Sequence, residues 1–266
     1  MEKGRNLRSV NTDGGVNLQF KLLSAIGIII IVSGHCYHGG MELAYNWFPP
    51  YSYNLALFVF ISGYFYKTDY EANVGKYIWK RTKRLLIPAY LWNIFYGGMV
   101  AFLGLFGFTI GAKLDLYNLF VMPFVDGEAF QYNLGSWFVY PLFLVCIINV
   151  LFRKFLKLIH LDNELIVLIV YLAIGMIGIN TALENPTAIN GIVKLLVRTM
   201  FFLPCYEFGR FYKAVLEKKD TLNNVAYFAI IFAVQLILLT FCKDLEYTPS
   251  SVSYTHLRAH ETGRNL

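Results

Sequence analysis

The sequence is poor in charged residues and in cysteine. Only 15% of its 266 residues are charged, whereas 57% are hydrophobic and 17% are aromatic. Soluble domains carry about a quarter charged residues, so this composition excludes an ordinary soluble globule and indicates an integral membrane protein. The four cysteines form no CxxC pair and lie in or beside apolar segments. They therefore predict small buried side chains rather than a disulfide framework or a metal site.

Apolar stretches long enough to cross a membrane recur along the chain. A span needs roughly 20 apolar residues, with a range of about 17 to 25. The predicted spans are 18–36, 51–66, 85–106, 136–152, 165–179, 192–211 and 225–241. The predicted fold class is therefore all-α, a polytopic bundle of seven transmembrane helices.

Positively charged residues are distributed unevenly around these spans. Segment 1–21 and the connections 67–84, 153–164 and 210–220 together hold seventeen of the twenty-three Lys and Arg residues. The positive-inside rule therefore predicts a multi-pass cell-membrane protein with a cytoplasmic N-terminus. Basic residues spread over short loops orient a membrane protein, whereas a nucleic-acid site gathers them on one soluble face, so we expect no nucleic-acid partner.

Three segments follow from this pattern. Residues 1–17 are predicted to be a cytoplasmic lead-in, 18–245 a transmembrane domain, and 246–266 a disordered tail. From about residue 252 the tail resembles a translated sequencing adapter, so we expect it not to be native and the natural chain to continue further. We exclude the tail from functional argument.

The first two spans carry candidate catalytic residues. His35 and His38 follow an apolar run, and an imidazole there either faces a polar cavity as a functional group or lies solvated in the interface. Ser62, Gly63 and Tyr64 lie within the second span, where a hydroxyl can bond across helices. Close helix packing by small residues is the favoured interpretation of these three.

Two further groups of charged residues flank or enter later spans. The first comprises Lys80, Arg81, Lys83 and Arg84, at the predicted cytoplasmic end of the third span. Arg81 and Arg84 share a helix face and can bind phosphate, although basic residues there also set topology. The second group, in the sixth span, comprises Lys194, Arg198 and Glu207. Lys194 and Arg198 lie one turn apart on the same helix face. They either bind an anion between them or extend to the outer interface as a snorkelling pair.

Together these groups suggest a site reached from both membrane faces. A basic cytoplasmic mouth can hold a phosphate-rich donor. An imidazole at the far end can act as general base on a hydroxyl, because its pKa lies close to the operating pH.

Several motifs in this order resemble the membrane-bound acyltransferase-3 family of O-acyltransferases. They are SGH at 33–35, LFVFISGYF at 57–65, KRTKRLLIPAYLW at 80–92, GSWFVYPLFLV at 135–145 and FLPCYEFG at 202–209. The resemblance implies a bundle of about ten helices that transfers an acyl group, usually acetyl, from cytoplasmic acyl-CoA. The acceptor it implies is a hydroxyl of an extracytoplasmic or lipid-linked glycan.

The resemblance also implies roles for particular residues. His35 is similar to the family's catalytic histidine, and Arg81 and Arg84 to the basic pair that meets the CoA phosphates. The family commonly has Arg or Lys eleven residues before the histidine, where this chain has Ser24, with Lys21 one turn earlier. About three spans after the seventh are expected to be missing.

We therefore expect a membrane O-acyltransferase that acetylates a polysaccharide or a lipid-linked sugar, with acetyl-CoA as donor substrate and no bound cofactor. His35 is the expected general base, and Ser62 or His38 orients the acceptor. One alternative is a transporter or flippase for a glycan or small anion, although such proteins often show internal repeats and none is evident here. A purely structural membrane subunit is a further alternative, which leaves His35 without a purpose.

Overall fold

The computed structural model describes residues 11–12, 16–36, 50–108, 114–184, 189–217, 219 and 221–241. Of the predicted segments, the tail 246–266 and most of the lead-in lie outside this description, as does His38. In the first helix, side chains are described for positions 19–32. The side chain of His35 is therefore also outside the described residues.

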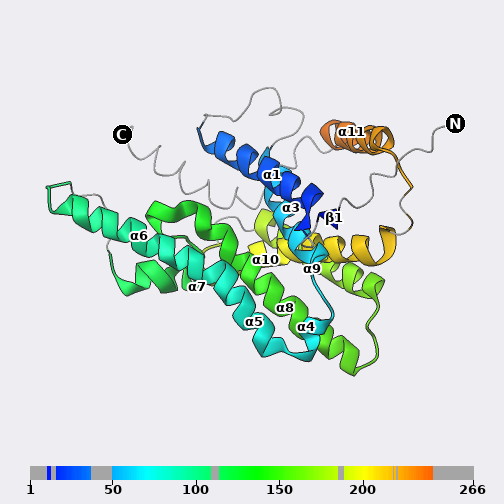
Figure 1. Cartoon of the computed structure of the whole chain (residues 1–266), viewed down its shortest axis with the longest axis horizontal. Coiled ribbons are helices and arrows are strands. Elements are labelled where there is room, and N and C mark those ends of the chain that lie inside the picture. Colours follow the sequence, from blue (N-terminus) through cyan, green and yellow to red (C-terminus); the bar gives the residue numbers. More distant parts are fainter. Residues whose placement is uncertain are drawn as a thin grey trace.

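The described chain is built almost entirely from helices (Figure 1). A short antiparallel ladder pairs β1 (Asn11–Thr12) with β2 (Val16–Asn17) before the first helix. The α-helices are α1 (Leu18–Cys36), α3 (Pro50–Tyr64), α4 (Asp69–Ala72), α5 (Val74–Arg81), α6 (Ile87–Gly104), α7 (Met122–Val125), α8 (Val139–Leu158), α9 (Glu164–Glu184), α10 (Gly191–Phe211) and α11 (Asn224–Phe241). The other helical turns are the π-turns η1 (Thr82–Leu86), η2 (Tyr117–Val121) and η4 (Tyr212–Leu216), and the 3₁₀ segment η3 (Gln131–Phe138).

The predicted all-α membrane bundle is confirmed. Within the described residues, three continuous helices are long and apolar enough to cross a membrane, namely Val74–Gly104, Gln131–Leu158 and Glu164–Glu184. Shorter apolar helices run over Gln19–Val32, Leu55–Tyr64 and Val225–Val234. The predicted sixth span, α10, is not among these helices, because it carries four charged side chains.

The third predicted span differs most from expectation. A span beginning at residue 85 was predicted, but the helix already begins at Val74 and continues through η1 into α6. Asn73 starts it, since its side-chain oxygen accepts a hydrogen bond from the Lys76 amide at 3.4 Å. Lys80, Arg81, Lys83 and Arg84 therefore lie on a helix and not in a connection.

Helix α10 lies at the centre of the bundle and packs against α3, α8 and α9 (Figure 1). Its backbone meets that of α3 directly. A Cβ atom at Gly63 would lie 1.8 Å from the carbonyl oxygen of Tyr206, and one at Gly209 would lie 2.1 Å from that of Phe60. The packing interpretation of Gly63 is therefore confirmed, because only glycine permits this approach.

Large apolar side chains cover much of the outer surface. Trp92, Phe95 and Phe102 of α6 are each more than half exposed, as is Ile177 on α9. Soluble proteins rarely expose apolar patches of this extent. The bundle is therefore built for an apolar surrounding, with its charged groups gathered around α10.

Candidate functional site

A buried network of charged side chains joins α8, α9 and α10. Arg153 of α8 is 0% exposed and forms an ion pair with Glu207 of α10. Its other partners are Glu164 at 2.5 Å and Asp162 at 3.3 Å. Arg210, one turn after Glu207 on α10, also pairs with Glu164, at 2.8 Å. Glu164 therefore bridges two guanidinium groups at the start of α9.

The same network reaches α4 through Glu71. The Glu71 carboxylate is buried and lies 3.5 Å from Arg210 and 3.8 Å from Lys157. We call Glu71, Arg153, Asp162, Glu164, Glu207 and Arg210 the Arg153 network. Sequence analysis assigned Arg153 and Arg210 to loops that set topology, which is wrong, because both lie inside the helix bundle. α8 continues to Leu158, so Arg153 lies within the helix rather than at its end.

Four tyrosines pack together beside this network. They are Tyr66, which follows α3, Tyr70 of α4, Tyr77 of α5 and Tyr206 of α10, and we call them the tyrosine cluster. The rings of Tyr70 and Tyr77 stack at 4.6 Å, and Tyr66 meets Tyr206 edge to face at 6.3 Å. The Tyr66 hydroxyl donates to the Glu71 carboxylate of the Arg153 network at 3.3 Å.

Each of three cations lies over one ring of the tyrosine cluster. Lys80 lies 5.0 Å from the ring centre of Tyr70, and its amine donates to the Tyr70 hydroxyl at 3.1 Å. Arg81 lies 5.1 Å from the Tyr77 ring, and its Nε donates to the Tyr77 hydroxyl at 3.0 Å. The third cation, Arg210, lies 4.8 Å from the ring centre of Tyr66. Two of the predicted donor-binding residues, Lys80 and Arg81, are thus fixed by cation–π contacts and hydrogen bonds.

The other two predicted donor-binding residues are more exposed. Arg81 is partly buried, whereas Lys83 and Arg84 are exposed. Lys83 lies 5.0 Å from the ring centre of Trp79, which is itself 55% exposed. Arg84 lies inside the π-turn η1, whose wider winding turns it further from the face of Arg81 than a regular α-helix would. The role of the two arginines as a pair stays a prediction.

The tyrosine cluster and His35 belong to opposite ends of the first helix pair. The ring of Phe20, near the start of α1, lies 4.3 Å from that of Tyr64, at the end of α3. Tyr66 follows two residues later, so the tyrosine cluster lies at this end. His35 is fifteen residues beyond Phe20 on α1, which places its backbone roughly 22 Å further along the helix axis.

Three further polar residues lie toward the Phe20–Tyr64 end of this helix pair, away from the backbone of His35. Ser62 is half-buried on α3, beside Gly63, where α3 and α10 meet. Ser24, which replaces the expected basic residue, donates from its hydroxyl to the Phe20 carbonyl at 2.7 Å. Lys21 is exposed. Ser24 is thus bonded to its own helix.

A second group of buried charges lies at the beginning of α10. Lys194 and Arg198 are each 1% exposed, so the snorkelling interpretation is wrong for both. Lys194 forms an ion pair with Glu128. Arg198 donates to the Gly127 carbonyl at 2.8 Å and lies 4.3 Å from the Trp137 ring centre. We call Gly127, Glu128, Trp137, Lys194 and Arg198 the Arg198 cluster.

The Arg198 cluster does not join the Arg153 network. Arg198 and Glu207 are nine residues apart on α10, roughly 13 Å along its axis. Between them lie the buried side chains of Phe202 and Leu203. The structure therefore divides the three charged residues predicted in the sixth span between two separate places.

A short chain of amide and hydroxyl groups links α6 to η3. Asn93 of α6 is 0% exposed and donates to the Leu119 carbonyl at 2.8 Å. Asn133 donates to the Asn93 side-chain oxygen at 2.7 Å, and Ser136 donates to the Asn133 carbonyl at 2.8 Å. These bonds hold the irregular stretch before α8 against α6.

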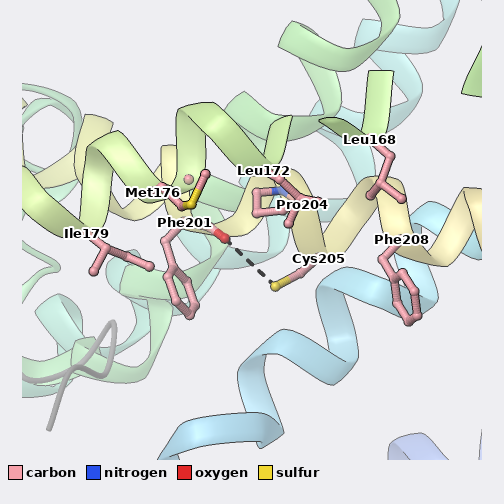
Figure 2. Close-up of a pocket in the computed structure, with 9 residues that line it drawn as sticks. Leu168, Leu172, Met176, Ile179, Phe201, Pro204, Cys205 and Phe208 are labelled. Carbon is pink, nitrogen blue, oxygen red and sulfur yellow. Dashed lines mark hydrogen bonds between the residues drawn. The ribbon is translucent and has the colours of Figure 1, made fainter. Parts of the chain in front are cut away.

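Two apolar grooves flank α10, and neither holds a predicted site residue. One, of about 490 Å³, lies between α9 and α10 and is drawn in Figure 2 with Met176, Phe201 and Phe208 on its walls. There the Cys205 thiol donates to the Phe201 carbonyl at 3.8 Å. The other, of about 500 Å³, lies between α1, α3 and α10. Apart from the Cys205 thiol, the side chains that line both grooves are apolar.

Chemically, the tyrosine cluster with Lys80 and Arg81 is suited to an anionic ligand. Arginine carries several N–H donors, and because its Nε is bonded to Tyr77, its terminal nitrogens are the ones that can bind a phosphate. Sequence analysis missed Tyr77, Tyr206 and the partners of Arg153. Tyr206 and Glu207 lie in FLPCYEFG, one of the quoted motifs, which is the signal that pointed to this region.

A family model described as an acyltransferase domain matches residues 17–256 of the chain. The match covers all described residues from Asn17 onward. Comparison with curated proteins and with solved structures found no significant match to the chain.

Proposed function

Because the chain belongs to the acyltransferase-3 family of membrane acyltransferases, we propose that it moves an acetyl group from cytoplasmic acetyl-CoA to a glycan hydroxyl. The acceptor is a cell-surface polysaccharide or a lipid-linked sugar. Support beyond the family comes from one observation. Lys80 and Arg81 are held by buried tyrosines at the end of the α1–α3 pair opposite to the backbone of His35.

In the proposed reaction the donor enters at the cytoplasmic side, with its phosphates on Lys80 and Arg81. Lys83 and Arg84, exposed on the same side, add positive charge that attracts the anionic donor. The acyl thioester reaches into the bundle toward His35. The orientation of the protein in this scheme follows the distribution of its basic loops.

His35 is the proposed general base. Its imidazole takes the proton from the sugar hydroxyl as that oxygen attacks the thioester carbonyl. The tetrahedral intermediate collapses with loss of the CoA thiolate, which takes up a proton, and the ester remains on the sugar. His38 is proposed to orient the acceptor hydroxyl, because Ser62, two residues before Tyr64, lies at the opposite end of the α1–α3 pair.

The test replaces His35 with alanine in cells that carry the complete gene and measures O-acetyl groups on surface glycans by mass spectrometry. We expect acetylation to be lost while the protein stays at normal levels in the membrane. The matched control is His160→Asn, because His160 is exposed in the turn after α8 and Asn tolerates its φ of 58°. Normal acetylation in the His35→Ala cells would remove His35 from the mechanism.

The transporter alternative needs polar groups along one path through the bundle. The buried charges on α10 are instead divided by Phe202 and Leu203, and Lys194 and Glu207 each have a partner of opposite charge. We therefore favour the enzyme. Release of free thiol from acetyl-CoA in membranes that contain the protein and a glycan acceptor separates the two, since a transporter consumes no thioester.

A further inference from the structure

A hydrogen-bonded chain connects the central helix to Arg81. Tyr206 of α10 is 0% exposed, and its hydroxyl lies 3.3 Å from that of Tyr77, which is 1% exposed. The Tyr77 hydroxyl in turn accepts the Nε hydrogen of Arg81 at 3.0 Å. Buried hydroxyl groups are costly without partners, so the Tyr206 hydroxyl depends on Tyr77 and on the buried Cys146 thiol beside both rings, whereas Tyr77 also has Arg81.

This chain restricts the guanidinium group in two ways. The bond from Nε fixes one edge of the plane, and the Tyr77 ring lies 5.1 Å from its central carbon. A free arginine side chain samples many rotamers, and ordering it on binding a ligand costs entropy. Arg81 is already ordered, so its remaining nitrogens are prepared for a phosphate.

The far end of the chain is anchored as well. Glu207, the next residue after Tyr206, forms an ion pair with the fully buried Arg153. Gly209 brings α10 against the backbone of α3 at the same level. Rotation and sliding of α10 are therefore restricted at Tyr206, and the position of its hydroxyl is fixed by contacts outside the donor site.

From these contacts we propose that Tyr206 is a positioning residue for the donor, which acts through Tyr77 on Arg81. This inference rests on the proposed function, because it assigns acetyl-CoA as the ligand of Arg81. Tyr206 does not itself touch the donor. Its hydroxyl keeps the Tyr77 hydroxyl in place to accept from Nε, and Arg81 then offers its terminal nitrogens to the phosphates.

The experiment measures the Kd of radiolabelled acetyl-CoA for the purified full chain in detergent. Tyr206→Phe removes one hydroxyl and keeps the ring, so we expect Kd to rise about fivefold, the effect of one hydrogen bond. The control is Tyr140→Phe, because Tyr140 is also 1% exposed but packs in a different apolar cluster from Tyr77 and Tyr206. We expect the control to bind like the wild type.

A double mutant distinguishes positioning from a general structural role. In an Arg81→Lys background the Nε bond to Tyr77 is absent, so adding Tyr206→Phe should leave Kd unchanged. A structural role would weaken binding in both backgrounds, which would overturn the inference. If Tyr206→Phe does not fold, Tyr77→Phe tests the same chain, since it removes the Nε acceptor and keeps the ring, and the same rise in Kd is expected.

The two proposals fail in different ways. If the wild-type protein binds no acetyl-CoA, the proposed function falls and the inference with it. If the wild type binds acetyl-CoA and the Phe variants at 206 and 77 bind equally well, only the positioning role of Tyr206 is overturned.

Discussion

The two groups of buried charge on α10 neutralise their buried cations in different ways. In the Arg153 network, two arginines share four carboxylates from three connected regions of the chain. In the Arg198 cluster the two cations have different partners. Lys194 pairs with the Glu128 carboxylate, and Arg198 contacts the Gly127 carbonyl and the Trp137 ring. A shared network couples many elements, whereas separate pairs can be lost one at a time.

The difference has a consequence for stability. Breaking a buried ion pair by removing one partner leaves an uncompensated charge, which costs several kcal/mol. A charge that can reach water costs much less. The Arg153 network buries both Arg153 and Glu207 completely, while the Glu128 side chain of the Arg198 cluster remains 39% exposed. Substitutions in the Arg153 network should therefore lower stability more than substitutions in the Arg198 cluster.

The largest effect is expected for Arg153→Leu. It leaves Glu207 buried without its cation, so the free energy of unfolding should fall by about 3–5 kcal/mol. Denaturant unfolding of the detergent-solubilised protein measures the change. The control is Lys154→Leu, because Lys154 is the next residue on α8 and is exposed. Equal stability of the two variants would mean that the network contributes nothing.

A smaller effect is expected for Arg198→Lys. The substitution keeps the positive charge but loses the guanidinium contact with the Trp137 ring and the bond to the Gly127 carbonyl, so we expect a loss of about 1–2 kcal/mol. The same unfolding experiment, followed by the fluorescence of the tryptophans, reports it. A loss as large as that of Arg153→Leu would contradict the distinction between shared and separate partners.

The smallest effect is expected for Lys194→Met. The neutral side chain fills similar space, and the abandoned Glu128 carboxylate can be solvated, so stability should fall by about 1 kcal/mol or less. Combining Lys194→Met with Glu128→Gln should then restore most of the loss. If the single variant unfolds as readily as Arg153→Leu, Glu128 is less accessible to water than its exposure indicates.

Much of the helical framework was predictable from apolar run length, and the deviations occur where charges enter the helices. Apolar run length identified the helices that became α1, α8 and α9, since a span must satisfy its own backbone hydrogen bonds. Run length failed at α5, because the basic segment 67–84 was predicted to be a connection although the helix begins at Val74. On this helix, Lys80 and Arg81 contact Tyr70 and Tyr77.

The candidate site was predictable only in part. Lys80 and Arg81 were identified, but their supports Tyr70, Tyr77 and Tyr206 were not, since nothing in the sequence shows that Tyr206 lies beside residues more than a hundred positions earlier. Arg153 was misassigned for the same reason, because its partner Glu207 is distant in sequence. The roles of His35, His38 and Ser62 stay predictions.

By itself, the sequence determined that this chain forms an all-α membrane bundle of the acyltransferase-3 family, because apolar run length and motif order are local properties of the chain. Only the tertiary structure decided which cations are buried, which carboxylates neutralise them and which basic residues the tyrosines hold. Those outcomes depend on contacts between helices far apart in the sequence, and a buried charge is stable only where such a contact supplies its partner.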